Sequence, residues 1–200
     1  MTSSSSNTPV VGLVGLGAMG SGMAQSLRRA GHAPHVFDVR PGVAEAFARE
    51  GGTACDTLAA LGAQCDIVVS VVVNAAQTES VLFGDGTTPG CAASMKPGSL
   101  FVMCSTVDPN WSVALEARLA QQGILYLDAP ISGGAAKAAS GQMTMMTAGT
   151  PAAYEKAGAM LDAMAAKVYR LGDSAGAGSK VKVINQLLAG VHIAAAAEAM

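Results

Sequence analysis

The chain has 200 residues, of which 50% are hydrophobic and 13% are charged, and its formal net charge is −2. This composition excludes a disordered chain, because it supplies enough apolar side chains for a core. The near-neutral charge gives no electrostatic footprint for binding nucleic acid or an anionic membrane surface.

Residues 1–9 are rich in Ser and Thr and lack the basic start and apolar run of a targeting peptide, so we expect a disordered tail. No uncharged apolar run reaches the ~20 residues that a membrane-spanning helix needs. The cysteines form no C-x-x-C pair and no metal-binding cluster with histidine. They are predicted to be reduced core thiols of a cytoplasmic protein without a metal site: Cys55, Cys65, Cys91 and Cys104.

The first ordered segment, Val10–Val14, is a short apolar run that predicts a strand buried on both faces. Glycines follow at positions 15, 17 and 20 in G-x-G-x-x-G spacing, and Ser21–Ala30 is predicted to be a helix. Gly15 allows the tight turn, Gly17 lets backbone N–H groups approach a pyrophosphate, and Gly20 lets the helix pack close to the strand. This arrangement predicts a dinucleotide site at the helix N-terminus. A turn without a ligand is the alternative.

The second predicted strand, His35–Asp38, ends in an acid about 20 residues after the glycine turn. Asp38 can accept hydrogen bonds from the ribose hydroxyls of the adenosine and would repel a 2′-phosphate, which favours NAD over NADP. Arg40 keeps NADP as the minor alternative. The cofactor contacts predicted here are Gly15, Leu16, Gly17, Ala18, Met19, Gly20, Asp38, Val39 and Arg40.

Short apolar runs alternate with helical segments through the middle of the chain. Helices are predicted at Pro41–Glu50, Thr57–Leu61, Asn74–Phe83 and Asp108–Gln122, and strands at Cys65–Val73, Leu100–Cys104 and Ile124–Leu127. The alternation predicts an α/β fold with a Rossmann-type, doubly wound, mainly parallel sheet. Ligands bind beyond the carboxyl ends of such strands, so Val73, Thr106 and the segment after Leu127 should converge on one site.

The segment D-A-P-I-S-G-G (residues 128–134) comes directly after a predicted strand. Its Ser132 hydroxyl and the N–H groups of its two glycines can cradle a carboxylate. A Gly-rich turn without a ligand is the alternative. Beyond it, strands are predicted at Met143–Ala148 and Lys167–Leu171, on either side of the helix Pro151–Met164.

The last stretch, Gly176–Met200, predicts a mostly apolar helix that carries the candidate catalytic residue. At roughly 100° per residue, Lys182 shares a face with Asn185 and Gln186, whereas Lys180 lies about 200° away. Apolar surroundings lower the pKa of a lysine towards the range that proton transfer needs. A solvated lysine near a helix start is the alternative.

Four motifs together resemble the β-hydroxyacid dehydrogenase family, which contains 3-hydroxyisobutyrate dehydrogenase and tartronate semialdehyde reductase. They are G-L-G-A-M-G-S-G-M-A (Gly15–Ala24), C-S-T-V-D-P (Cys104–Pro109), D-A-P-I-S-G-G-A-A-K-A-A-S-G (Asp128–Gly141) and G-A-G-S-K-V-K-V-I-N-Q (Gly176–Gln186). The resemblance implies that Lys182 is catalytic, that Thr106 lies beside the nicotinamide and that Val73 belongs to a cofactor loop. It implies substrate contacts from Ser132, Gly133, Gly134, Asn185 and Gln186, although Gln186 stands where the family often has Asn.

Within this family, Gly133–Thr144 and Asn185–Met200 most resemble the L-threonate dehydrogenase branch, which acts on four-carbon sugar acids. Lys137 belongs to that similarity and is a further expected substrate contact. The implied function is NAD-dependent oxidation of a small hydroxy acid, such as L-threonate to its 2-oxo acid, with Lys182 taking the hydroxyl proton. The alternatives are activity on 3-hydroxyisobutyrate or on glycerate and tartronate semialdehyde, and a non-catalytic nucleotide-binding scaffold. Imine reductases would typically replace the lysine, and the D-A-P-I-S-G-G segment fits a phosphogluconate-type dehydrogenase less well.

Members of the family continue past the lysine-bearing helix into an all-helical domain. We therefore expect an NAD-binding domain over residues 10–175 and the start of an interdomain helix over residues 176–200, with the C-terminal helical domain absent from this chain. Such a chain is expected to bind cofactor, to turn over poorly and to self-associate through the uncovered helix face. The full-length protein is expected to be a homo-oligomer.

Overall fold

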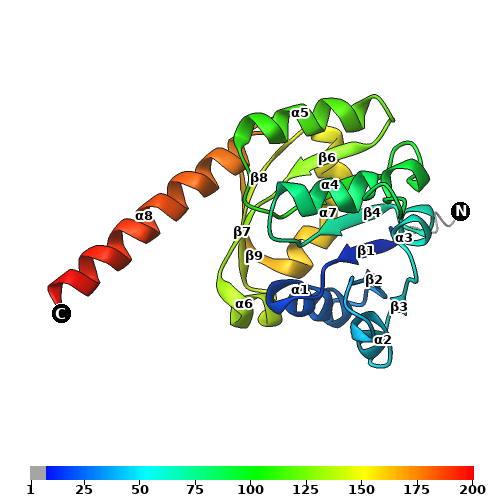
Figure 1. Cartoon of the computed structure of the whole chain (residues 1–200), viewed down its shortest axis with the longest axis horizontal. Coiled ribbons are helices and arrows are strands. Elements are labelled where there is room, and N and C mark those ends of the chain that lie inside the picture. Colours follow the sequence, from blue (N-terminus) through cyan, green and yellow to red (C-terminus); the bar gives the residue numbers. More distant parts are fainter. Residues whose placement is uncertain (1–7) are drawn as a thin grey trace, which may run out of the picture.

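A single sheet, covered by helices on both faces, forms the body of the molecule (Figure 1). The computed structural model describes residues 8–200, so most of the tail predicted over residues 1–9 lies outside the described part. The strand order is β3-β2-β1-β4-β5-β6-β8-β7, and β9 pairs with β8.

The larger part of this sheet is parallel. Its six strands are β3 (Thr53–Ala54), β2 (His35–Phe37), β1 (Val11–Val14), β4 (Ile67–Ser70), β5 (Leu100–Met103) and β6 (Leu125–Asp128). Three further strands, β8 (Met143–Gly149), β7 (Ile131–Ser132) and β9 (Ala165–Arg170), extend it. β8 is antiparallel to β6 and to β7 and parallel to β9. The predicted mainly parallel, doubly wound sheet is confirmed.

Two apolar cores lie on opposite faces of the sheet. Along β5, Val102 belongs to one core, while its neighbours Phe101 and Met103 belong to the other. Because both faces are covered, the central strands read as continuous apolar runs rather than as alternating patterns.

The helices divide between these two cores. The first core includes residues of α1 (Ala18–Arg29), α2 (Val43–Ala48), α6 (Gly134–Ser140) and α7 (Pro151–Met164). The second includes residues of α3 (Leu58–Gln64), α4 (Ala75–Phe83), the 3₁₀-helix η1 (Ala92–Ser94) and α5 (Pro109–Ala120). Because the six strands of the larger part run parallel, their carboxyl ends lie at one edge of the sheet, where ligands of such folds bind.

The short helix α6 was not predicted, because its Ala-rich sequence lacks the apolar period that marks a helix packed against a core. α6 packs closely on α1, because a Cβ at Gly22 would lie 2.5 Å from the backbone nitrogen of Ala139. The hydroxyl of Ser26 also donates a 2.9 Å hydrogen bond to the carbonyl of Ala138. The helix α1 begins at Ala18, earlier than the predicted start at Ser21.

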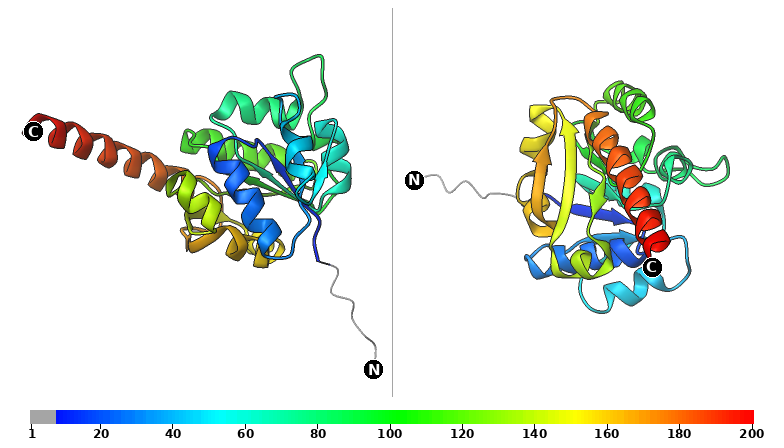
Figure 2. Two further views of the ribbon diagram at one scale, coloured as in Figure 1. Left: turned by 90° about the horizontal axis from the view of Figure 1, so that it is seen from below. Right: turned by 90° about the vertical axis from the view of Figure 1, so that its left-hand side faces the viewer.

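The last helix, α8 (Ala177–Ala199), begins against β8, α5 and β6 and then runs away from the body (Figures 1 and 2). Its buried residues are Gly178, Ser179 and Lys182, and every residue from Val183 onwards is exposed. The exposed large apolar side chains of α8 are Val181, Val183, Ile184, Leu187, Leu188, Val191 and Ile193.

All four cysteines are buried free thiols, as predicted. Burial raises the pKa of Cys65, Cys91 and Cys104 to about 12, so these groups are neutral thiols at physiological pH. Over residues 8–200, no helix has both the length and the apolar character needed to cross a membrane.

Candidate active site

The glycine turn after β1 has the tight geometry that its spacing predicts. Gly15 has a φ of +92°, and a Cβ there would lie 2.6 Å from the carbonyl oxygen of Val71. A Cβ at Gly20 would lie only 1.8 Å from the carbonyl oxygen of Gly15. Both positions therefore require glycine, and together they hold the start of α1 against the ends of β1 and β4.

Gly17 differs, because a Cβ there would meet no atom within 4 Å. It is the N-cap residue of α1, and no side chain caps the helix there. The first N–H groups of a helix lack intrahelical partners and carry partial positive charge. Open space over an uncapped helix N-terminus fits the pyrophosphate of a dinucleotide.

Asp38, just after β2, is tied to this turn. Its carboxylate accepts hydrogen bonds from the backbone N–H of Leu16 at 2.7 Å and of Arg40 at 2.9 Å. The Arg40 side chain adds Nε at 2.9 Å and Nη2 at 3.0 Å. The Arg40 hydrogen bonds lower the pKa of Asp38 to about 2 against the cost of its burial. Because four donors fill the acceptor sites of a carboxylate, ribose hydroxyls would have to replace the Arg40 side chain.

A cavity of about 610 Å³ opens beside the turn. Six of the predicted cofactor contacts line it: Gly15, Gly17, Asp38, Val39, Arg40 and Val73. Leu16, Ala18, Met19 and Gly20 belong to the turn or to the first turn of α1 without lining the cavity, and Thr106 lies exposed after β5 outside it.

Several polar residues of this cavity were not predicted from the sequence, among them Gln77 and Thr88. Gln77 accepts a 2.8 Å hydrogen bond from the backbone N–H of Val73, so it fixes the loop after β4. The hydroxyl of Ser105 holds the same loop through a 2.8 Å bond to the carbonyl of Val72. A Gln three residues after a helix start often hydrogen-bonds the backbone at that start, so the spacing of Asn74 and Gln77 could have indicated this role.

A second cavity, of about 390 Å³, brings Ser132 on β7 and Asn185 on α8 together. Thr144 and Tyr169 also line it and were not anticipated from the sequence. The two cavities share no lining residue. The predicted substrate contacts that do not line the second cavity are Gly133, Gly134, Lys137 and Gln186.

Lys182 lies on α8 one turn from Gln186 and is only 7% exposed. Its Nζ donates a 2.9 Å hydrogen bond to Oε1 of Gln186, so these two side chains share a face as predicted. Burial lowers the pKa of Lys182, in the direction that its sequence surroundings indicated. Lys180 is exposed. Lys182 lines neither cavity, although its neighbour Val181 lines the second. A partly desolvated amine can accept and return a proton.

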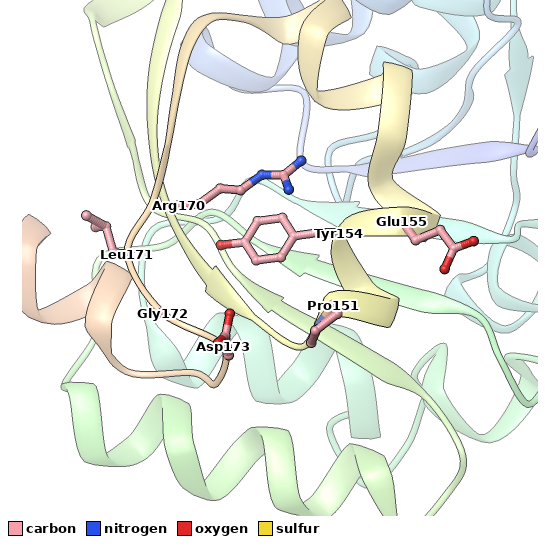
Figure 3. A pocket seen from close by; sticks show the side chains of 7 residues that line it. All are labelled: Pro151, Tyr154, Glu155, Arg170, Leu171, Gly172 and Asp173. Carbon is pink, nitrogen blue, oxygen red and sulfur yellow. The ribbon is translucent and has the colours of Figure 1, made fainter.

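A third cavity, of about 590 Å³, lies between the start of α7 and the end of β9 with the segment after it (Figure 3), and it shares Leu171 with the second cavity. The Arg170 guanidinium stacks over the Tyr154 ring there at 4.5 Å. None of its lining residues was predicted to bind cofactor or substrate. Among residues 8–200, no group of three or more His, Cys, Asp or Glu side chains could hold a metal ion.

A glycine turn, an uncapped helix N-terminus and an acid after the second strand, all on a doubly wound sheet, define a dinucleotide-binding domain of the Rossmann type. The chain belongs to the family described as the NAD binding domain of 6-phosphogluconate dehydrogenase, whose profile matches residues 10–172.

Curated proteins of similar sequence include L-threonate dehydrogenases. The enzyme of Cupriavidus necator is 60% identical over 190 residues, which is 95% of this chain and 63% of that protein. The enzyme of Pectobacterium atrosepticum is 47% identical over 191 residues, or 95% of this chain and 62% of that protein. The chain thus spans less than two thirds of the length of these relatives.

A solved structure of a 3-hydroxyisobutyrate dehydrogenase from Salmonella typhimurium has a similar fold. It aligns with a TM-score of 0.89 and 46% sequence identity, over 95% of this chain and 65% of that one. The resemblance drawn from the four sequence motifs is confirmed by these relatives.

Proposed function

We propose that the protein containing this chain is an NAD-dependent dehydrogenase that oxidises a four-carbon sugar acid of the L-threonate type to its 2-oxo acid. Similarity to the L-threonate dehydrogenases supports the substrate class. The observation that carries the reaction type is Lys182, a buried amine with a lowered pKa, three residues before Asn185 of the second cavity on the same helix.

When bound, NAD supplies the acceptor for the hydride that leaves the carbinol carbon. In this direction, neutral Lys182 takes the hydroxyl proton, so the C–H and O–H bonds break as the C=O bond forms. In the reverse direction its ammonium returns the proton. Ser132 and the N–H groups of the two following glycines would hold the carboxylate, and Asn185 a hydroxyl of the substrate.

Asp38 supports NAD as the cofactor, because a carboxylate at this place repels a 2′-phosphate. The four free thiols support a reducing compartment such as the cytoplasm. The exposed apolar side chains of α8 support a further helical domain or a second copy of the chain as their cover.

The substrate is tested by measuring turnover with L-threonate, D-glycerate and 3-hydroxyisobutyrate. The absorbance of the NADH that forms reports the rate. We expect L-threonate to give the highest kcat/KM. A preference for either of the other acids would replace L-threonate in the proposal. Absence of turnover with every acid, in the whole protein that contains this chain, would remove the dehydrogenase function.

The role of Lys182 is tested by Lys182→Met, with Lys180→Met as the matched control on the exposed side of the same helix turn. We expect Lys182→Met to lower kcat by about 100- to 10,000-fold, as for loss of a general base, with the Kd of NADH nearly unchanged. Lys180→Met should retain normal turnover. Retained turnover in Lys182→Met would exclude this lysine from the reaction.

A further inference from the structure

The end of β6 and the start of α8 are joined by one buried carboxylate. Asp128 is the last residue of β6 and is fully buried. Its Oδ2 accepts hydrogen bonds from the backbone N–H groups of Gly176 and Ser179, each at 2.9 Å. Its Oδ1 accepts a 2.6 Å hydrogen bond from the hydroxyl of Ser179.

Asp128 thereby takes the place of an N-cap side chain. The N-cap residue of α8 is Gly176, which offers no side chain of its own. The first N–H groups of a helix need acceptors, and an anion is favoured beside them. Here the acceptor comes from a strand 48 positions earlier in the chain.

Only the start of this helix contacts the domain, against β8, α5 and β6, because its side chains are exposed from Val183 onwards. Its first turn approaches the sheet so closely that a Cβ at Gly178 would lie 2.5 Å from the carbonyl oxygen of Met146. Such a close backbone contact tolerates little displacement. Together with this close packing, the hydrogen bonds of Asp128 hold the start of the helix and the direction in which its faces point.

The same carboxylate connects two groups of the candidate active site. Ser132 follows Asp128 four residues later on the same segment, and Lys182 follows Ser179 by three residues on the same helix face. Asp128 itself lines neither candidate cavity, so it does not meet the reacting atoms. We propose that Asp128 is a positioning residue that fixes the Lys182 amine relative to the Ser132 loop. This inference rests on the proposed catalytic role of Lys182.

Competitive acetylation of the lysines in the 200-residue chain tests the anchor without requiring turnover. Labelling with acetic anhydride across a pH series, read by mass spectrometry, gives the titration midpoint of Lys182, with the exposed Lys180 as internal reference. Asp128→Asn places an amide among three donors, and Ser179→Ala removes one of the three bonds. If either variant displaces the helix, Lys182 becomes more solvated and its midpoint moves upward. If Asp128→Asn does not fold, the Lys182 midpoint in Ser179→Ala tests the inference.

Thr57→Ala is the matched control, because it removes the capping hydroxyl of a different helix, α3. It should leave the Lys182 midpoint unchanged. An unchanged midpoint in folded Asp128→Asn or in Ser179→Ala would overturn the inference.

Kinetics then separate this inference from the proposed function. We expect Asp128→Asn to lower kcat by about 10- to 100-fold, as for a displaced catalytic group, with the Kd of NADH unchanged. General loss of structure would weaken NADH binding as well, and that result would count against a positioning role. A shifted midpoint with normal turnover would retain the anchor and overturn the role of Lys182 in the reaction.

Discussion

The side-chain amine of Lys182 donates a 2.9 Å hydrogen bond to Oε1 of Gln186, one turn further along α8. This bond opposes the effect of burial, because an amide oxygen stabilises the ammonium more than the neutral amine. Burial lowers the pKa of Lys182, and the hydrogen bond to Gln186 acts in the opposite direction.

Replacing Gln186 should shift the pH dependence of turnover. In Gln186→Leu the acceptor is gone, so the pKa of Lys182 falls further below its ordinary value. Because oxidation requires the neutral amine, the rising limb of kcat against pH should move to lower pH. The falling limb of the reverse reaction, which requires the ammonium, should move the same way.

Gln186→Glu is the matched control for this prediction, because a carboxylate stabilises the ammonium. It should move both limbs to higher pH. Movement of the two variants in the same direction would show that Gln186 acts on turnover through something other than the Lys182 proton.

Replacing Asp38 beside Arg40 should change the preference between NADH and NADPH. The Arg40 side chain donates two hydrogen bonds to Asp38 and one to the carbonyl of Leu16. Asp38→Ser removes the negative charge and leaves the guanidinium free to bind a 2′-phosphate. We expect NADPH to bind about 10-fold more tightly and NADH about 10-fold more weakly, as for a hydrogen bond gained and lost. Quenching of protein fluorescence measures both Kd values.

The double variant Asp38→Ser with Arg40→Gln provides the control, since it lacks both charges. The gain in NADPH affinity should disappear in it. If the gain persists, the 2′-phosphate is held by a group other than Arg40.

The same carboxylate predicts how stability depends on pH. The pKa of Asp38 falls from 3.8 to about 2 in the folded chain. A carboxyl whose pKa is lower in the folded chain stabilises the fold at pH values above its pKa in the unfolded chain. This stabilisation is lost as the pH falls through the pKa of the folded chain. The shift corresponds to roughly 2 kcal/mol, which solvent around the exposed Arg40 guanidinium reduces to about 1 kcal/mol.

Asp38→Asn should therefore be about 1 kcal/mol less stable than the parent chain in urea at neutral pH. The difference should narrow as pH falls from about 4 towards about 2. Asp162→Asn, at an exposed position of α7, is the matched control and should have the stability of the parent at neutral pH. A gap for Asp38→Asn that does not change with pH would contradict the link to its carboxylate.

The sequence predicts the β1–α1 turn well because its glycines meet local steric demands that few other residues satisfy. That β4 and β5 are covered on both faces is also predictable from the sequence, since both sides of each strand are apolar. By contrast, the antiparallel place of β8 and the capping of α8 by Asp128 depend on partners distant in the chain, which no local pattern encodes. The separation of Ser132 and the glycine turn into two cavities likewise follows from tertiary packing.

Substitutions at Gly20 and Gly17 should affect different properties, Gly20 the stability of the fold and Gly17 the binding of the cofactor. Gly20→Ala would place a Cβ 1.8 Å from the carbonyl oxygen of Gly15, so α1 must shift away from the turn. Such overpacking costs about 1–3 kcal/mol or more. We therefore expect urea unfolding to give a free energy of unfolding for Gly20→Ala that is lower than that of the parent by at least about 1 kcal/mol.

Gly17→Ala is the matched variant on the same turn. Its Cβ would meet no atom within 4 Å and its φ of −66° suits alanine, so the free energy of unfolding should change by less than about 0.5 kcal/mol. The new methyl group occupies the space that a pyrophosphate needs over the α1 N-terminus. We expect NADH to bind at least about 10-fold more weakly, because backbone N–H bonds to the phosphates lengthen or are lost. Normal NADH affinity in Gly17→Ala would mean that the dinucleotide crosses the domain somewhere other than this turn.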